Sequence, residues 1–239
     1  MQLDIVDLIS GISASAILLT GYVTGFLTII KGAKQNASLM VWSGMFLVLM
    51  GQFYLGTVVS FVKLLLTGTN LATPYLAARL AYAGAPISIT IAMYVGFSMI
   101  RPEWRRTMVA IYAASAVFYW LGLFVPIYAP ITMEEIIIPG ELGAPDSLVD
   151  ISLQSWVLIL TALYLLSMLV FNTSGLLNLA RKSSGIIKKK SIIQSVGYFI
   201  FVIIGAIDSL VPLGQFIFIP RIVMVIGYVL LYVGYTIQK

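Results

Sequence analysis

The sequence predicts an all-α membrane protein, a single domain of seven transmembrane helices that covers residues 1–239. The chain is 60% hydrophobic and 10% charged, which is far from the composition of a soluble globular domain. Seven apolar stretches each reach the roughly 20 helical residues that cross about 30 Å of hydrocarbon. The apolar residues in these stretches run continuously rather than alternating with polar residues, which favours helices over a β-barrel. A helix also satisfies the hydrogen bonds of its own backbone in lipid.

The apolar stretches define the expected spans in order along the chain. We expect helices over residues 8–30, 39–62, 74–99, 107–129, 152–179, 191–212 and 216–237. The first is expected to be a genuine span rather than a cleaved leader, because it follows the acidic segment MQLDIVDL and no small-residue cleavage site is convincing.

Only one connection, residues 130–151, is long. Its EEIII segment is predicted to form a short strand or an interfacial segment, because Pro139, Gly140 and Pro145 break any helix. Loops of this length often act as lids or binding elements, and the alternative is a solvated cap over the bundle.

The charged residues sort to the two ends of the predicted bundle. Eleven of the fourteen basic residues follow spans one, three and five or end the chain, whereas eight of the nine acidic residues lie toward the other end. The positive-inside rule therefore predicts an outside N-terminus and a cytoplasmic C-terminus in a cell membrane. This placement explains the net charge of +5 without a nucleic-acid partner. The run RKSSGIIKKK is read as a topology anchor, with anionic lipid head groups as an alternative partner.

The chain contains no cysteine and no histidine. Disulfides, thiolate metal sites and thiol nucleophiles are thereby excluded, as are most nucleophile–base pairs and the usual transition-metal ligands. We therefore expect no metal, no cofactor and no enzymatic activity. An enzyme using Glu134 or Glu135 has little support, because no paired carboxylates occur in a buried setting.

The third span has a close-packing face and a polar face. Small residues recur every four positions in two rows: Ala77, Ala81 and Ala85, and Gly84, Ser88, Ala92 and Gly96. Such rows let a neighbouring helix approach closely, so this span is expected to be central. The polar stripe contains Arg79, Tyr82, Pro86 and Thr90, and Pro86 is expected to kink the helix and free a carbonyl for another partner. On span five, Asn172, Thr173 and Asn178 are expected to form helix–helix hydrogen bonds, and the alternative is a transport site.

Polar residues near the predicted outer end form a candidate ligand site. Its members are Arg79, Tyr82, Asp208, Arg221, Lys63, Gln52 and Tyr228. Folded into a ring, they would line an outward-opening cavity suited to an anionic or carboxylate-bearing ligand, with Arg79 as its bidentate donor and Asp208 as partner or gate. The alternative is structural: the basic side chains snorkel to the interface and pair with Asp208 or with the acidic loop. Both interpretations predict a carboxylate beside Arg79, and only the first requires a cavity there.

Two families of seven-span proteins are similar to the chain. The expected topology and the AARLAYAGAP segment resemble microbial rhodopsins, but RIVMVIGYVLLYVGYTIQK has no lysine before Lys239, so retinal is rejected. The segments RLAYAGAPISITIAMYVGF and RKSSGIIKKKSIIQSVGYFIF resemble the third helix and the basic start of helix six in the seven-transmembrane sensor region of prokaryotic, especially archaeal, histidine kinases. That resemblance implies a sensor that signals through a separate partner, or a part of a longer protein.

These observations lead to two functional hypotheses. The first is a receptor-like sensor that binds a ligand or lipid from the outer side and signals to a cytoplasmic partner. The second is a small-solute transporter with three-plus-one-plus-three helix repeats, because GFLTIIKGAK is similar to GLLNLARKSS and Arg79 corresponds to Arg221. Membrane lipids are partners in either case, and an oligomer is compatible with both.

Overall fold

Seven helices in the described part of the chain are long and apolar enough to cross a membrane, as the sequence predicts. The computed structural model describes residues 5–68, 71, 74–125, 137–139, 149–151, 156–210 and 213–237. Helices one to seven are Ile5–Lys34, Ser38–Thr67, Leu76–Ile100, Pro102–Phe124, Trp156–Lys182, Gly185–Ser209 and Gln215–Thr236. The chain is therefore a multi-pass, helical membrane protein, and its orientation stays a prediction from the basic residues.

Several of these helices are built from more than one regular segment. Helix one is α1 (Ile5–Lys34), helix six is α10 (Gly185–Leu210), and helix seven is η4 (Gly214–Ile217) followed by α11 (Phe218–Thr236). Helix two comprises α2 (Ser38–Gly51), η1 (Gln52–Tyr54) and α3 (Leu55–Thr67), and helix four comprises η2 (Pro102–Trp104) and α6 (Arg105–Phe124). Helix three comprises α4 (Pro74–Tyr82) and α5 (Ala85–Ile100), and helix five comprises α8 (Trp156–Ser167), the π-helical segment η3 (Met168–Thr173) and α9 (Ser174–Lys182).

Helix three is interrupted between α4 and α5, where the sequence predicts a kink. Pro86 lies in the first turn of α5, and its missing N–H cannot continue the hydrogen bonds of α4. The carbonyls of this turn find partners on neighbouring helices: Gln52 Nε2 donates to Leu80 O at 3.3 Å, and Trp120 Nε1 donates to Ala83 O at 2.9 Å. Side chains from helices two and four thus satisfy the break.

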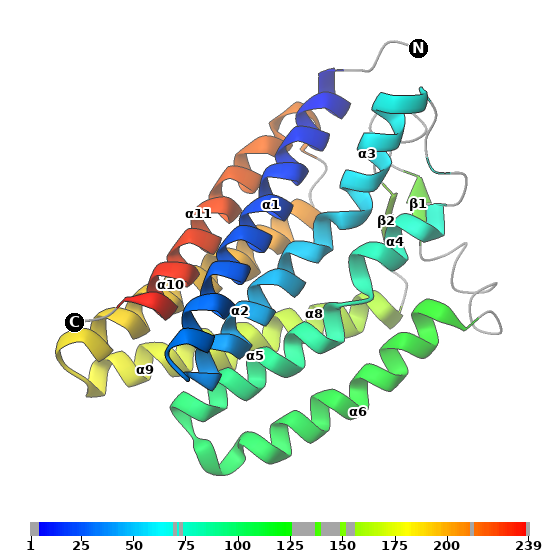
Figure 1. Ribbon diagram of the computed structural model, residues 1–239. Coiled ribbons are helices and arrows are strands. Elements are labelled where there is room, and N and C mark those ends of the chain that lie inside the picture. The colour runs from blue at the N-terminus through cyan, green and yellow to red at the C-terminus, as the bar shows by residue number, and fades with distance from the viewer. Residues whose placement is uncertain are drawn as a thin grey trace.

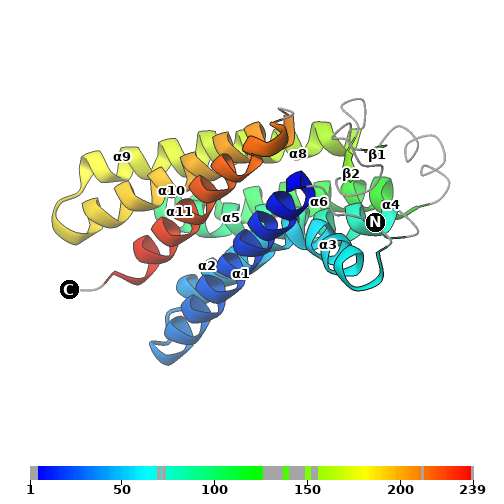
Figure 2. The same ribbon diagram turned by 90° about the horizontal axis from the view of Figure 1, so that it is seen from above.

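Neighbours in sequence lie side by side in the bundle, and helix seven returns to pack against helix one (Figures 1 and 2). Helix three is central, as expected. In its apolar 18-residue stretch, 61% is buried inside the bundle, compared with 28 to 39% in the corresponding stretches of the other six helices. Its small residues explain this position. Ala77 lies against Gly56 of helix two, and Gly96 lies against Asn172 of helix five, with no room for a further carbon atom in either place.

The long loop contributes a small strand pair to an otherwise helical fold. Strand β1 (Ile137–Pro139) pairs antiparallel with β2 (Val149–Ile151), with Ile138 opposite Asp150. The strand predicted for EEIII thus begins at Ile137 in the structure. Both strands pack beside α4 (Figure 1), and the remainder of residues 130–151 lies outside the described residues.

The two ends of the bundle differ in charge. We call the end that carries Lys31, Arg105, Arg181 and Lys188 the basic end, and the other the N-terminal end. The start of α1 and the end of α11 lie at these opposite ends, as an odd number of spans requires (Figure 1).

Candidate functional site

A buried ion pair between helices six and seven lies near the N-terminal end. Arg221 Nε is 3.2 Å from Asp208 Oδ1, and the two side chains are 4% and 8% exposed. Arg221 lies in the first turn of α11, and Asp208 lies in the last turn of α10. The short connection between these two helices brings the charges together.

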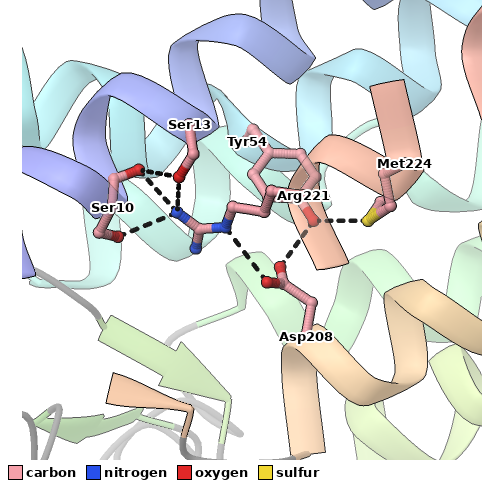
Figure 3. Close-up of polar contacts among 6 residues, drawn as sticks. All are labelled: Ser10, Ser13, Tyr54, Asp208, Arg221 and Met224. Carbon is pink, nitrogen blue, oxygen red and sulfur yellow. Dashed lines mark hydrogen bonds and ion pairs between the residues drawn. The ribbon is translucent and has the colours of Figure 1, made fainter. Parts of the chain in front are cut away.

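Helices one and two complete the coordination of this pair (Figure 3). Arg221 Nη1 donates to Ser10 O at 2.6 Å, and Ser10 Oγ and Ser13 Oγ lie 3.0 and 3.2 Å from it. The Tyr54 hydroxyl donates to Asp208 Oδ2 at 2.7 Å, and the Arg221 guanidinium lies 5.5 Å from the centre of the Tyr54 ring. We call these five residues the ion-pair cluster. It joins helices one, two, six and seven.

The hydrogen bonds of the cluster explain how two charges are accommodated inside an apolar bundle. A buried pair is tolerated only when further hydrogen bonds satisfy its remaining donors and acceptors. Here both Asp208 oxygens accept a hydrogen bond, and Arg221 donates through two of its nitrogens. The attraction is strong in such surroundings, and so is the penalty for separating the partners.

Arg79, the expected centre of the site, has different surroundings. Its Nε donates to Leu123 O at 3.2 Å, and its guanidinium lies 5.7 Å from the centre of the Phe124 ring. Asp208, which we expected beside Arg79, pairs with Arg221 instead. Among the side chains that the structure describes, no carboxylate forms an ion pair with Arg79. Glu134, Glu135, Glu141 and Asp146 of the acidic loop lie outside the described residues, and the side chain of Asp150 is not described either.

The remaining members of the expected ring lie in three separate places. Gln52 and Tyr82 lie at the break in helix three, where the Tyr82 ring packs edge-on against Phe53 at 5.8 Å. Lys63 is partly exposed on α3. Tyr228 is fully buried beside Phe201, with a ring separation of 5.5 Å. The seven residues therefore do not line one common cavity.

Two small cavities adjoin polar groups, and neither touches Arg79. One, of about 10 Å³, lies between helices one and two, where α1 meets α3, and includes Asp7, Ser10 and Ser60 in its lining. The other, of about 20 Å³, is lined by Ser88, Thr161 and other residues of helices two, three and five. Each has room for about one water molecule, whereas ligand pockets usually enclose about 300–1,000 Å³. The expected outward-opening cavity thus finds no counterpart in these two spaces of the described structure.

A second polar network lies nearer the basic end. The hydroxyls of Tyr198 and Tyr235 are 2.6 Å apart, and Ser195 Oγ donates to Thr173 O at 2.8 Å. Asn172 Nδ2 donates to Ala92 O at 3.2 Å, which agrees with the helix–helix hydrogen bond expected from the sequence. Asn172 and Thr173 both belong to the π-helical segment, a rare geometry that is frequent at functional sites.

Sequence reasoning missed three members of the ion-pair cluster. Ser10 and Ser13 are three residues apart and so share a face of helix one, a signal that was present but unspecific. Tyr54 was one of thirteen tyrosines and had no distinguishing pattern. Its role follows from the packing of helix two beside helices six and seven.

The surroundings of the two arginines also bear on the proposed repeat. Arg221 is buried and bonded to a carboxylate, whereas Arg79 is partly exposed and bonded to a main-chain oxygen. Positions that correspond in the sequence therefore have different environments.

Comparisons with protein-family models, curated proteins and solved structures give no match to this chain.

Proposed function

We propose that the chain is a receptor-like membrane sensor without enzymatic activity. In this proposal a ligand or lipid with an anionic group acts at the N-terminal end, taken as the outer side of a cell membrane, and the signal passes to a cytoplasmic partner. The observation that carries the proposal is the buried Arg221–Asp208 pair, which joins four of the seven helices.

Energetics favour a functional interpretation of this pair. Ionisable residues inside a membrane are costly, and they mark functional sites more often than stabilising ones. A buried pair adds little net stability compared with apolar residues of similar volume, but breaking it is strongly unfavourable. An anionic group that competes with Asp208 for Arg221 would therefore shift the bundle from an arrangement in which the Arg221–Asp208 pair is formed to one in which it is broken.

Helix seven offers a route from this pair to the basic end. Arg221, Tyr228 and Tyr235 are spaced seven residues apart and are all buried, so one face of α11 remains inside the bundle along its length. The α11 helix is continuous to Thr236, whose carbonyl accepts a hydrogen bond from Lys31. A rotation or tilt that begins at Arg221 would reach the contacts with helices one and six at the basic end.

A distance measurement with spin labels tests this proposal. The natural chain has no cysteine, so cysteines placed at Lys188 and Ile237 are the only labelling sites. Asp208→Asn weakens the ion pair with little change in shape. We expect it to shift the distance distribution between the two labels in nanodiscs by several ångströms. Glu103→Gln, which alters an exposed carboxylate at the basic end, is the matched control.

The same labelled protein distinguishes the source of the anionic group. Phosphatidylglycerol nanodiscs are compared with phosphatidylcholine nanodiscs, and citrate is added to the second set as a soluble carboxylate. A shift in either condition, reduced in Asp208→Asn, supports the proposal and identifies lipid or solute as the source. If the distance distribution between the labels is unchanged in Asp208→Asn and in every lipid and citrate condition, the proposed shift between two arrangements is ruled out. A separate measurement of solute flux in proteoliposomes would, if flux is found, favour a transporter.

A further inference from the structure

The connection between helices five and six concentrates positive charge at the basic end. Helix α9 ends at Lys182, and α10 begins at Gly185. We call residues 181–190, RKSSGIIKKK, the basic hairpin. Its charged members are Arg181, Lys182, Lys188, Lys189 and Lys190. Helices α9 and α10 pack side by side, so these residues lie together at one edge of the bundle (Figures 1 and 2).

The charges of the hairpin have no acidic partner within the described part of the chain. No described carboxylate lies within ion-pair distance of any of them. Among the described residues, Glu103 is the only acidic one at the basic end, and it is exposed in the connection between helices three and four. The charge of the hairpin must therefore be balanced by another molecule.

The backbone of α10 adds to the positive field. The first N–H groups of a helix lack partners within the helix and carry partial positive charge. Lys188 closes the first turn of α10, and Lys189 and Lys190 follow it directly. An anion at this point would interact favourably with both the lysines and the helix N-terminus. The orientation of the chain depends on such lysines but does not supply their counter-charge.

Apolar side chains among the charges indicate the surroundings of the hairpin. The Ile187 side chain is 58% exposed, although it lies between the two groups of basic residues, and Ile192 is exposed further along α10. Such side chains are stabilised by hydrocarbon rather than by water. Lysine stems extend along hydrocarbon and place their ammonium groups among the head groups. A phospholipid offers hydrocarbon and phosphate in one molecule, whereas an acidic soluble segment offers only the charge.

The length of helix six places the lysines at the depth of the lipid phosphates. Helix α10 has 26 residues, which span about 39 Å at about 1.5 Å per residue. The hydrocarbon core is about 30 Å thick, and the bilayer with its head groups is about 40–45 Å thick. A helix of this length, centred on the bilayer, ends within the head-group layers. Lys188 lies about 5 Å along the axis from that end, at the boundary with the hydrocarbon.

We propose that the basic hairpin is a binding site for the head groups of anionic phospholipids in the leaflet at the basic end. Clusters of four to eight basic residues beside a transmembrane helix are typical of such sites. The five positive charges exceed the single charge of phosphatidylglycerol, so a lipid with two phosphates, such as cardiolipin, satisfies more of them. The site lies at the opposite end from the Arg221–Asp208 pair, and the proposal does not depend on the proposed function.

The distribution of lipids around the hairpin tests the site. The natural chain has no cysteine, so Ser184→Cys, at an exposed position in the hairpin, carries a single donor fluorophore. Phosphatidylcholine nanodiscs contain a small fraction of cardiolipin, phosphatidylglycerol or phosphatidylcholine with an acceptor on an acyl chain. We expect energy transfer to report about tenfold more cardiolipin than phosphatidylcholine near the label, with phosphatidylglycerol between them. Equal transfer to all three lipids would overturn the proposal.

Removal of the lysines shows whether the enrichment depends on the hairpin. The variant Lys188→Gln/Lys189→Gln/Lys190→Gln removes three of its five charges, and each basic residue near the surface contributes about fivefold in affinity for anionic lipid. We expect this variant to lose most of the cardiolipin enrichment. Undiminished enrichment in the folded variant would contradict the proposal.

A matched control removes the same charge from the same end of the bundle. The variant Lys34→Gln/Arg101→Gln/Arg106→Gln changes three exposed residues outside the hairpin. We expect it to retain most of the enrichment at the label. An equal loss in both triple variants would show that the whole basic end attracts lipid diffusely, and the hairpin would then not be a site.

The other side of the hairpin keeps the test decisive if the triple lysine variant does not fold. Arg181→Gln with Lys182→Gln removes the two charges at the end of α9. We expect the enrichment of cardiolipin to fall several-fold. Enrichment equal to that of the natural sequence would count against the hairpin as the site.

Two soluble competitors distinguish other occupants of the same surface. Millimolar inorganic phosphate represents a free phosphate ligand, and a poly-glutamate peptide represents an acidic protein partner. We expect cardiolipin to remain enriched in the presence of either one. Loss of the enrichment with inorganic phosphate would indicate a site for free phosphate, and loss with the peptide would indicate a surface for an acidic protein. Either result would overturn the assignment to lipid.

Discussion

Lys31, near the end of helix one, donates a hydrogen bond from Nζ to the main-chain oxygen of Thr236, at the end of helix seven, over 2.7 Å. The last carbonyls of a helix lack partners within the helix and carry partial negative charge, so an ammonium group stabilises them. The C-terminal ends of helix one and helix seven are thereby connected at the basic end.

Lys31→Met should loosen the end of helix seven while keeping the apolar stem of the side chain. We expect a loss of about 1 kcal/mol locally, which corresponds to about fivefold faster amide exchange over residues 233–237. Hydrogen–deuterium exchange in nanodiscs measures this effect. Lys34→Met, at an exposed position in the same turn, should leave the exchange unchanged.

The Arg221–Asp208 pair should show strong energetic coupling. Arg221→Met and Asp208→Leu each leave one buried charge without its partner, and each should cost about 3–5 kcal/mol in the free energy of unfolding. The double variant should cost far less than the sum, because both charges are then absent. Unfolding in mixed micelles gives all three values, and simple additivity would contradict the importance of the pair.

The hydrogen bond between Tyr198 and Tyr235 should contribute more modestly. Tyr198→Phe and Tyr235→Phe each remove one hydroxyl, and interhelical hydrogen bonds in membranes contribute about 0.6 kcal/mol on average and at most about 1.7. We expect a coupling energy in this range from a double-mutant cycle. Tyr22→Phe, at a partly exposed position in helix one, serves as the control.

Gly56 should be sensitive to the addition of one methyl group. A Cβ atom there would collide with the main chain of Ala77, so Gly56→Ala should separate helices two and three and cost about 1–3 kcal/mol in the free energy of unfolding. At Gly205 the nearest atom to a new Cβ is Met224 Cε at 4.0 Å. Gly205→Ala should therefore be neutral or stabilising, because alanine favours a helix. Thermal unfolding of the two variants in the same detergent compares them directly.

Much of the architecture follows from sequence patterns with a direct physical cause. The number of spans depends on apolar length, and the break in helix three depends on the missing N–H of Pro86. The rows of small residues predicted the close packing of helix three, which the contacts at Ala77 and Gly96 confirm. Asn172 was expected to bond to another helix because hydrocarbon provides no alternative partner, and it does so at Ala92.

The partners of the charged residues depended on the tertiary structure. Arg79 and Arg221 have similar positions near helix ends, and the sequence makes either a suitable partner for Asp208. The choice depends on the rotation of each helix and on which helices are neighbours, and these follow from side-chain packing along whole helices. That packing places Arg221 inside the bundle with Asp208 and Ser10, and it places Arg79 beside Leu123 on helix four.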